Sequence, residues 1–130
     1  MSIKTVLKMG DPTLLKRSQE VLDFNTSELH ELIQNMKDTM MHMNGAGIAA
    51  PQIGELKRVV IFGFESNERY PDESEVPYTI LINPEIEVLD DEMEEGIEGC
   101  LSVPGLSGSV PRFVNIRYKG RDQKGEVIER

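Results

Sequence analysis

Residues 26–64 read TSELHELIQNMKDTMMHMNGAGIAAPQIGELKRVVIFGF, and this stretch decides the fold because its periodicity changes from helical to β. In its first part apolar residues recur at steps of three and four, which predicts a helix over 26–43 with one apolar face. That face contains Leu29, Leu32, Ile33, Met36, Met40 and Met43. Asn25 or Thr26 can cap the helix, and Asn44-Gly45 ends it, because both residues tolerate the left-handed conformation. The short apolar run 58–64 is typical of a buried strand.

Further strand patterns follow along the chain. They cover 78–82, 85–90, 112–119 and 126–128. The first is closed by Asn83-Pro84, and a turn at 122–125 joins the last two. A short helix is expected over 11–18, capped by Asp11. Helices at the front followed by strands joined through turns predict an α+β fold, in which the N-terminal helix packs with antiparallel β-sheets.

Length, composition and charge exclude several classes of protein. A chain of 130 residues with 38% hydrophobic and 28% charged residues is expected to form a single domain. One cysteine allows no internal disulfide, which fits a reducing cytoplasm. No apolar run or leader pattern predicts a membrane segment. The net charge of −9 disfavours direct nucleic-acid binding. Residues 65–98 hold thirteen of the twenty-three acidic residues, which we interpret as a solvated loop and hairpin tip.

Two segments have sequences that a purely structural role explains poorly. Residues 45–52 read GAGIAAPQ, whose small side chains leave the backbone open to close approach. Residues 98–105 read EGCLSVPG and contain the only cysteine of the chain. Each segment alone is more often a tight connection or a small buried hydrophobe.

Together these segments resemble the first two signature motifs of the peptide deformylases, G-x-G-x-A-A-x-Q and E-G-C-L-S. Further matches at Asp11-Pro12, Ile82-Asn83-Pro84-Glu85 and Val110-Pro111-Arg112 extend the resemblance over nearly the whole chain. The resemblance implies a cytoplasmic metal amidohydrolase. Its substrates would be formyl-Met nascent peptides at the ribosome, from which it removes the N-formyl group and releases formate.

The resemblance also implies roles for single residues. Cys100 would bind the metal as the thiolate, with Fe2+ as the native ion and Zn2+, Ni2+ or Co2+ as substitutes. The side chain of Gln52 and the backbone N–H of Leu101 would stabilise the oxyanion that forms when metal-activated water attacks the formyl carbonyl.

Substrate and support residues follow in the same way. The peptide would lie beside Gly45, Ala46 and Gly47 like an added strand, which suits an enzyme that accepts many sequences. Glu98 and Arg112 match a family ion pair that holds the cysteine segment in place.

The third motif of the family, H-E-x-x-H on a C-terminal helix, does not occur in the sequence. It would supply two histidine ligands and a proton-shuttling glutamate. His30-Glu31-Leu32-Ile33-Gln34 has one histidine too few and precedes the first motif, so His30 is interpreted as a helix-surface residue. His42 is expected to interact with the helix dipole. The expectation is a single deformylase-like domain over 1–130, C-terminally incomplete with its metal-binding helix missing, and poorly active alone because its metal site is incomplete.

Two alternatives remain at this point. A non-catalytic remnant of the same fold would keep the peptide groove and bind without metal. A thiol hydrolase would use Cys100 as nucleophile, but it would need a histidine base, and both histidines lie on the N-terminal helix.

Overall fold

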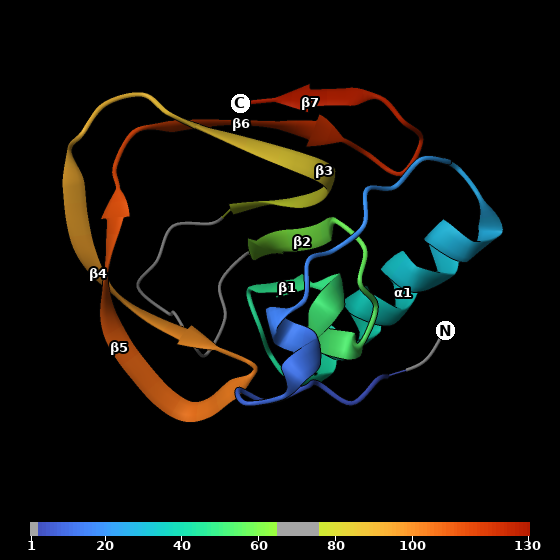
Figure 1. Cartoon of the computed structure of the whole chain (residues 1–130), viewed down its shortest axis with the longest axis horizontal. Helices are drawn as coiled ribbons and strands as arrows, with labels where there is room; N and C mark the ends of the chain where they lie inside the picture. Colours follow the sequence, from blue (N-terminus) through green and yellow to red (C-terminus); the bar gives the residue numbers. More distant parts are fainter. Residues whose placement is uncertain (1–2, 65–75) are drawn as a thin grey trace.

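The computed structural model describes residues 3–64 and 76–130 and has the predicted α+β architecture (Figure 1). The helices are η1 (Pro12–Leu15), α1 (Ser27–His42) and η2 (Ala50–Ile53). The strands are β1 (Gly47–Ala49), β2 (Val59–Phe64), β3 (Val76–Val88), β4 (Met93–Cys100), β5 (Val103–Phe113), β6 (Ile116–Arg121) and β7 (Val127–Glu129). They form an antiparallel five-stranded sheet of order β1-β2-β3-β6-β7 and a separate β4-β5 hairpin. No helix in the described ranges is both long and apolar enough to cross a membrane.

Helix α1 confirms the prediction over 26–43 to within one residue at each end. The Thr26 side chain caps it by accepting a hydrogen bond from the Leu29 N–H at 3.1 Å. Asn44 follows in the left-handed conformation with φ 54°. Met43 does not join the apolar face as predicted: it follows the last helical residue and is 41% exposed.

The hydrophobic core lies between α1 and the β1–β2–β3 part of the sheet. Its members are buried apolar residues of these elements and of η2, each with at most 6% exposure. They are Leu29, Ile33, Met36, Met40, Ile48, Ala50, Val59, Ile61 and Ile82. Figure 1 shows β1 at the edge of the sheet next to α1, and Ile48 and Ala50 of the first motif belong to this core.

Strand β3 corrects the predicted strand end at Asn83-Pro84. The strand continues through these residues to Val88, with a register shift against β6 between Ile82 and Glu85. Asn83 takes φ 53° at the shift, and its side chain exchanges two 2.8 Å hydrogen bonds with the backbone of Val21. The bulge therefore accommodates a proline that a regular ladder would exclude.

Two other predictions need smaller corrections. The pattern over 112–119 is divided between β5 and β6, because the chain leaves the hairpin at residues 114–115 and joins the large sheet. The helix expected over 11–18 is the short 3-10 turn η1, capped by Asp11 as predicted. The turn at 122–125 is confirmed, with Gly125 at φ 88°.

The acidic segment is only partly described. Residues 65–75 lie outside the described residues. The remainder runs along the second half of β3 and into β4, so several acidic side chains lie on strands and not at a hairpin tip. In Figure 1, β4 and β5 form a long curved hairpin whose closed end approaches the η1 and η2 region.

Candidate functional site

The first motif connects α1 to the edge of the five-stranded sheet. The Gly45 N–H donates to the Met40 carbonyl at the end of α1, and β1 then pairs with β2. The Ala49 N–H donates to Gln52 Oε1 at 2.9 Å, which directs this N–H away from β2. Because backbone groups of alternate residues in a strand point to the same edge, those of Gly47 also point away from β2. The outer edge of β1 at Gly47 is therefore available to an added strand.

The second motif forms the closed end of the β4–β5 hairpin. Cys100 ends β4 and pairs with Val103 at the start of β5, so Leu101 and Ser102 form the turn. Cys100 is exposed, whereas Leu101 is 8% and Ser102 is 5% exposed. The turn therefore presents its sulfur outward while its other two side chains point into the protein.

Gln52 joins the two motifs through its side-chain amide. The Nε2 group lies 3.0 Å from Ser102 Oγ and 3.7 Å from Cys100 Sγ, and donates to both. Its Oε1 accepts from the Ala49 N–H. The structure thus brings Gln52, Cys100 and the residue between Cys100 and Ser102 to one place, although 48 residues separate the first two in the sequence.

Gly45 packs closely against the second motif, a contact that the sequence did not reveal. A Cβ atom at this position would lie 2.8 Å from Leu101 Cδ1 and 3.3 Å from its Cγ. The missing side chain of the first motif therefore makes room for the buried leucine of the second. At Gly47 a Cβ would meet the backbone oxygen of Ile61 at 3.4 Å, which is a tight but ordinary approach.

The N-terminal segment also connects the motifs. The Leu7 N–H donates to the Gln52 carbonyl at 2.7 Å, and the Met9 N–H donates to the Ser102 carbonyl at 2.8 Å. These residues were not predicted as part of the site. Backbone donors leave no signature in the side-chain sequence, so no pattern could have indicated them.

Glu98 and Arg112 form a bidentate pair across the hairpin. Arg112 Nε donates to Glu98 Oε2 at 2.8 Å, and Nη2 donates to Oε1 at 2.7 Å. These hydrogen bonds hold the pKa of the Glu98 carboxyl below its ordinary value. Both side chains are substantially exposed, at 39% and 67%, so the pair is expected to add little to stability.

The described residues do not by themselves form a metal site. No group of three or more Cys, His, Asp or Glu side chains gathers anywhere in residues 3–64 and 76–130. His30 Nε2 donates to Asn25 Oδ1 at 2.8 Å near the start of α1, and His42 lies in the last turn of this helix. A catalytic tetrahedral metal centre normally has three protein ligands and a water molecule, and Cys100 alone could supply only one of these ligands.

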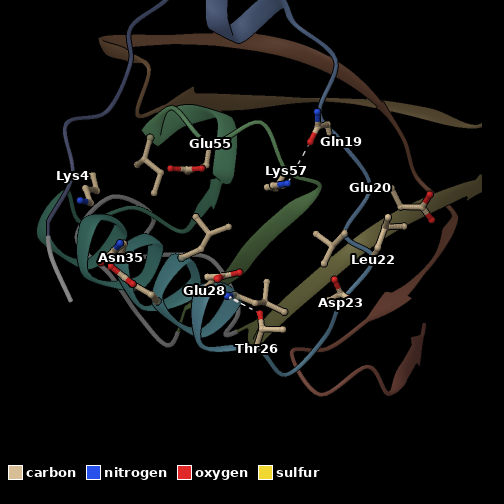
Figure 2. Close-up of a pocket in the computed structure, with 15 residues that line it drawn as sticks. Lys4, Gln19, Glu20, Leu22, Asp23, Thr26, Glu28, Asn35, Glu55 and Lys57 are labelled. Atoms are coloured by element: carbon tan, nitrogen blue, oxygen red, sulfur yellow. Dashed lines mark hydrogen bonds between the residues drawn. The ribbon is translucent and has the colours of Figure 1, made fainter.

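A groove lies apart from these residues, between the segment 19–23, α1 and η2 (Figure 2). Its volume is about 580 Å³, and its rim carries side chains of both charges, among them Glu28, Lys4 and Lys57. None of the predicted site residues lines it. The candidate site is therefore the open surface at Gln52 and Cys100.

Comparison with known proteins points to one family. The family profile described as polypeptide deformylase matches residues 3–130. Peptide deformylase 1 of Bordetella pertussis is 59% identical over 128 residues, which cover 98% of this chain and 73% of that protein. Peptide deformylase 2 of Ralstonia nicotianae is 58% identical, covering 98% and 72%.

Solved structures agree with this likeness. A ligand-bound class I type b peptide deformylase from Acinetobacter baumannii superposes with a TM-score of 0.95 at 38% identity, covering all of this chain and 83% of that one. A structure from the same organism described as Met-Ala-Ser bound gives a TM-score of 0.94 at 38% identity, covering 99% and 82%. The likeness therefore extends over sequence and fold alike.

Proposed function

This chain belongs to the peptide deformylase family, and from this premise we propose that it removes the N-formyl group from the initiator formyl-methionine of nascent polypeptides, releasing formate. One observation of the site carries the proposal. The Gln52 amide directs its N–H2 group toward Cys100, and Leu101 is the next residue in the chain. We infer that the Leu101 N–H faces the same point, so that a carbonyl oxygen beside the sulfur would meet two donors, as an acyl-hydrolysis site requires.

The substrate backbone would bind at the edge of β1. Gly45, Ala46 and Gly47 form the approach to this edge, and the outward-pointing N–H and C=O of Gly47 can pair with a peptide in the antiparallel manner. Main-chain pairing does not read side chains, so it would accept many sequences after the first residue. The Acinetobacter baumannii relative with bound Met-Ala-Ser supports a peptide that begins with methionine.

Gln52 and Leu101 would act on the formyl group itself. As a nucleophile adds to the carbonyl carbon, negative charge develops on its oxygen, and preorganised N–H donors stabilise that charge more than the starting carbonyl. The Gln52 amide is already held at its Oε1 by Ala49, so little reorganisation is needed during the reaction.

The family is one of metalloenzymes, and Cys100 would serve as a ligand through its thiolate. A bound metal would lower the pKa of a water molecule and so supply the nucleophile. Sulfur ligation suits Fe2+, with Zn2+, Ni2+ or Co2+ as substitutes. The ligands needed beyond Cys100 are not among the described residues, and we propose that they come from a segment in addition to residues 1–130.

Glu98 and Arg112 would hold the cysteine segment in place. The two-point contact between their planar groups would tie β4 to β5 two residues before Cys100. Neither side chain needs to contact the substrate for this role.

The cellular setting follows from the substrate. Formylated chains emerge from ribosomes in the cytoplasm, where we place this protein. The net charge of −9 opposes close approach to ribosomal RNA, so we expect contact with the nascent peptide and no direct nucleic-acid binding.

Formate release from formyl-Met-Ala-Ser, together with elemental analysis of the protein, tests the proposal. We expect little bound metal and slow turnover from the 130-residue chain alone. Both should rise when the part of the Bordetella pertussis relative that this chain does not match is added in trans under anaerobic Fe2+ loading. Cys100→Ala should abolish the metal gain, and Gln52→Ala should lower turnover about 100-fold with metal retained.

The outcomes separate the function from the ligand set. Stoichiometric metal and fast turnover by the chain alone would contradict the need for further ligands but not the activity. Absence of formate release in a fully metal-loaded complex would contradict the activity. Peptide binding by such a metal-loaded complex without formate release would instead support a non-catalytic peptide-binding protein.

A further inference from the structure

Ser102 is a buried polar residue that the roles above do not use. Its side chain is 5% exposed, and its Oγ lies 3.0 Å from Gln52 Nε2. We propose that Ser102 is a positioning residue: together with the Ala49 N–H, its hydroxyl holds the Gln52 carboxamide in the orientation that aims N–H2 at the reacting carbonyl. The inference deepens the proposed function and rests on it for its catalytic meaning.

The orientation of the Gln52 amide follows from the chemistry of its neighbours. A backbone N–H can only donate, so the end of the amide facing Ala49 must be the oxygen, which lies 2.9 Å away. The N–H2 group must then face the second motif, where the two acceptors are Ser102 Oγ and Cys100 Sγ. The Ala49 N–H therefore decides which end of the amide is the oxygen.

One anchor would not fix the amide. A carboxamide held at its oxygen alone can still rotate about that contact and about the flexible glutamine chain. The 3.7 Å contact to Cys100 Sγ is long, and sulfur is a weak acceptor. The 3.0 Å hydrogen bond to Ser102 Oγ is therefore the stronger of the two restraints at the nitrogen end.

The Ser102 hydroxyl restrains the Gln52 nitrogen without being needed for the fold of the turn. The Ser102 backbone is held separately, because its carbonyl accepts from the Met9 N–H at 2.8 Å. Leu101, the neighbouring turn residue, is anchored by packing on Gly45. Removing only Oγ by Ser102→Ala therefore leaves the backbone contacts of the turn in place while it releases the Gln52 nitrogen.

Nuclear magnetic resonance of the Gln52 side-chain amide tests the proposal without any activity assay. In the wild-type chain we expect slowed solvent exchange of the Nε2 protons and nuclear Overhauser contacts from them to the β-protons of Ser102 and Cys100. Ser102→Ala should accelerate this exchange about five- to tenfold, the effect of one hydrogen bond, and weaken the contact to Cys100. Ser102→Thr, which keeps Oγ, should restore the slow exchange.

Ser109→Ala is the matched control, since Ser109 lies in β5 and donates to Glu95 Oε2. It should leave the Gln52 amide unchanged. Unchanged exchange and contacts in Ser102→Ala would overturn the proposal, and so would fast exchange with no contact to Ser102 in the wild type, a result that needs no variant to fold. Because no turnover is measured, failure of the proposed activity would leave this result standing, and the reverse also holds.

Discussion

The two sheets of this protein are stabilised in different ways. The five-stranded sheet and α1 share a core of fully buried aliphatic residues, among them Met36 and Ile82 at 0% exposure. The strands of the β4–β5 hairpin contain no buried residue, and apolar side chains such as Ile97 are 70% exposed. In the described residues from 93 to 113, only Leu101 and Ser102 of the turn are buried.

The difference shows where the hairpin is attached to the core. Its turn packs on Gly45, hydrogen-bonds to Gln52 and receives the Met9 N–H, whereas the rest of the hairpin relies on its own ladder. The candidate site is this point of attachment. The same contacts that attach the hairpin to the core also place Cys100 next to the Gln52 amide. The site therefore forms when the turn packs on the core.

The largest effect is expected from truncating the core. Ile82→Ala should lower the free energy of unfolding by about 2–5 kcal/mol, because it removes buried methyl groups and leaves a cavity. Ile97→Ala in the hairpin should change it by less than about 0.5 kcal/mol. Urea unfolding followed by circular dichroism measures both, and equal losses in the two variants would break the comparison.

A smaller loss is expected where the two regions meet. Gly45→Ala should cost about 1–3 kcal/mol, since the new Cβ forces the buried Leu101 side chain to move. Gly108→Ala is the control in β5, because a Cβ there meets nothing within 4 Å. Amide shifts should change at residues 100–102 in the first variant alone, and a Gly45→Ala protein with an unperturbed turn would contradict the packing described.

Hydrogen exchange should distinguish the regions without any substitution. Amides in the β4–β5 ladder should exchange through local opening at least about tenfold faster than those in the β2–β3 ladder, because few buried contacts oppose the opening. Uniform protection across both sheets would mean that the hairpin is as firmly held as the core.

The smallest effect is expected at the Glu98–Arg112 pair. Because the folded state lowers the pKa of Glu98, the stabilisation is present at neutral pH and is lost as the pH falls through this lowered value. Carboxyl titration by nuclear magnetic resonance should show Glu98 with a pKa below the ordinary value of a glutamate. Arg112→Gln should raise the pKa of Glu98 toward its ordinary value, while the free energy of unfolding changes by less than about 0.5 kcal/mol.

The fold was predictable from sequence where local chemistry decides it. The helix over 26–43 and the turn at 122–125 carry their own caps and glycine, and both were predicted closely. The continuation of β3 through Asn83-Pro84 was not, because it depends on side-chain hydrogen bonds to Val21, 62 residues away. Likewise, motif resemblance indicated Gln52 and Cys100, but the contacts of Ser102 and Met9 arise only when the chain brings distant segments together.

The claim that both motifs form a single site is tested most directly by titrating the protein with formyl-Met-Ala-Ser in the presence of chelator. Amide and side-chain chemical shifts monitor the binding. We predict that residues 45–47, the Gln52 side chain and residues 100–102 shift together with one apparent Kd, and that Gln52→Ala weakens the response at both motifs. Shifts confined to the groove between residues 19–23 and α1, or a response in one motif without the other, would contradict the claim that the core and the hairpin form a single site.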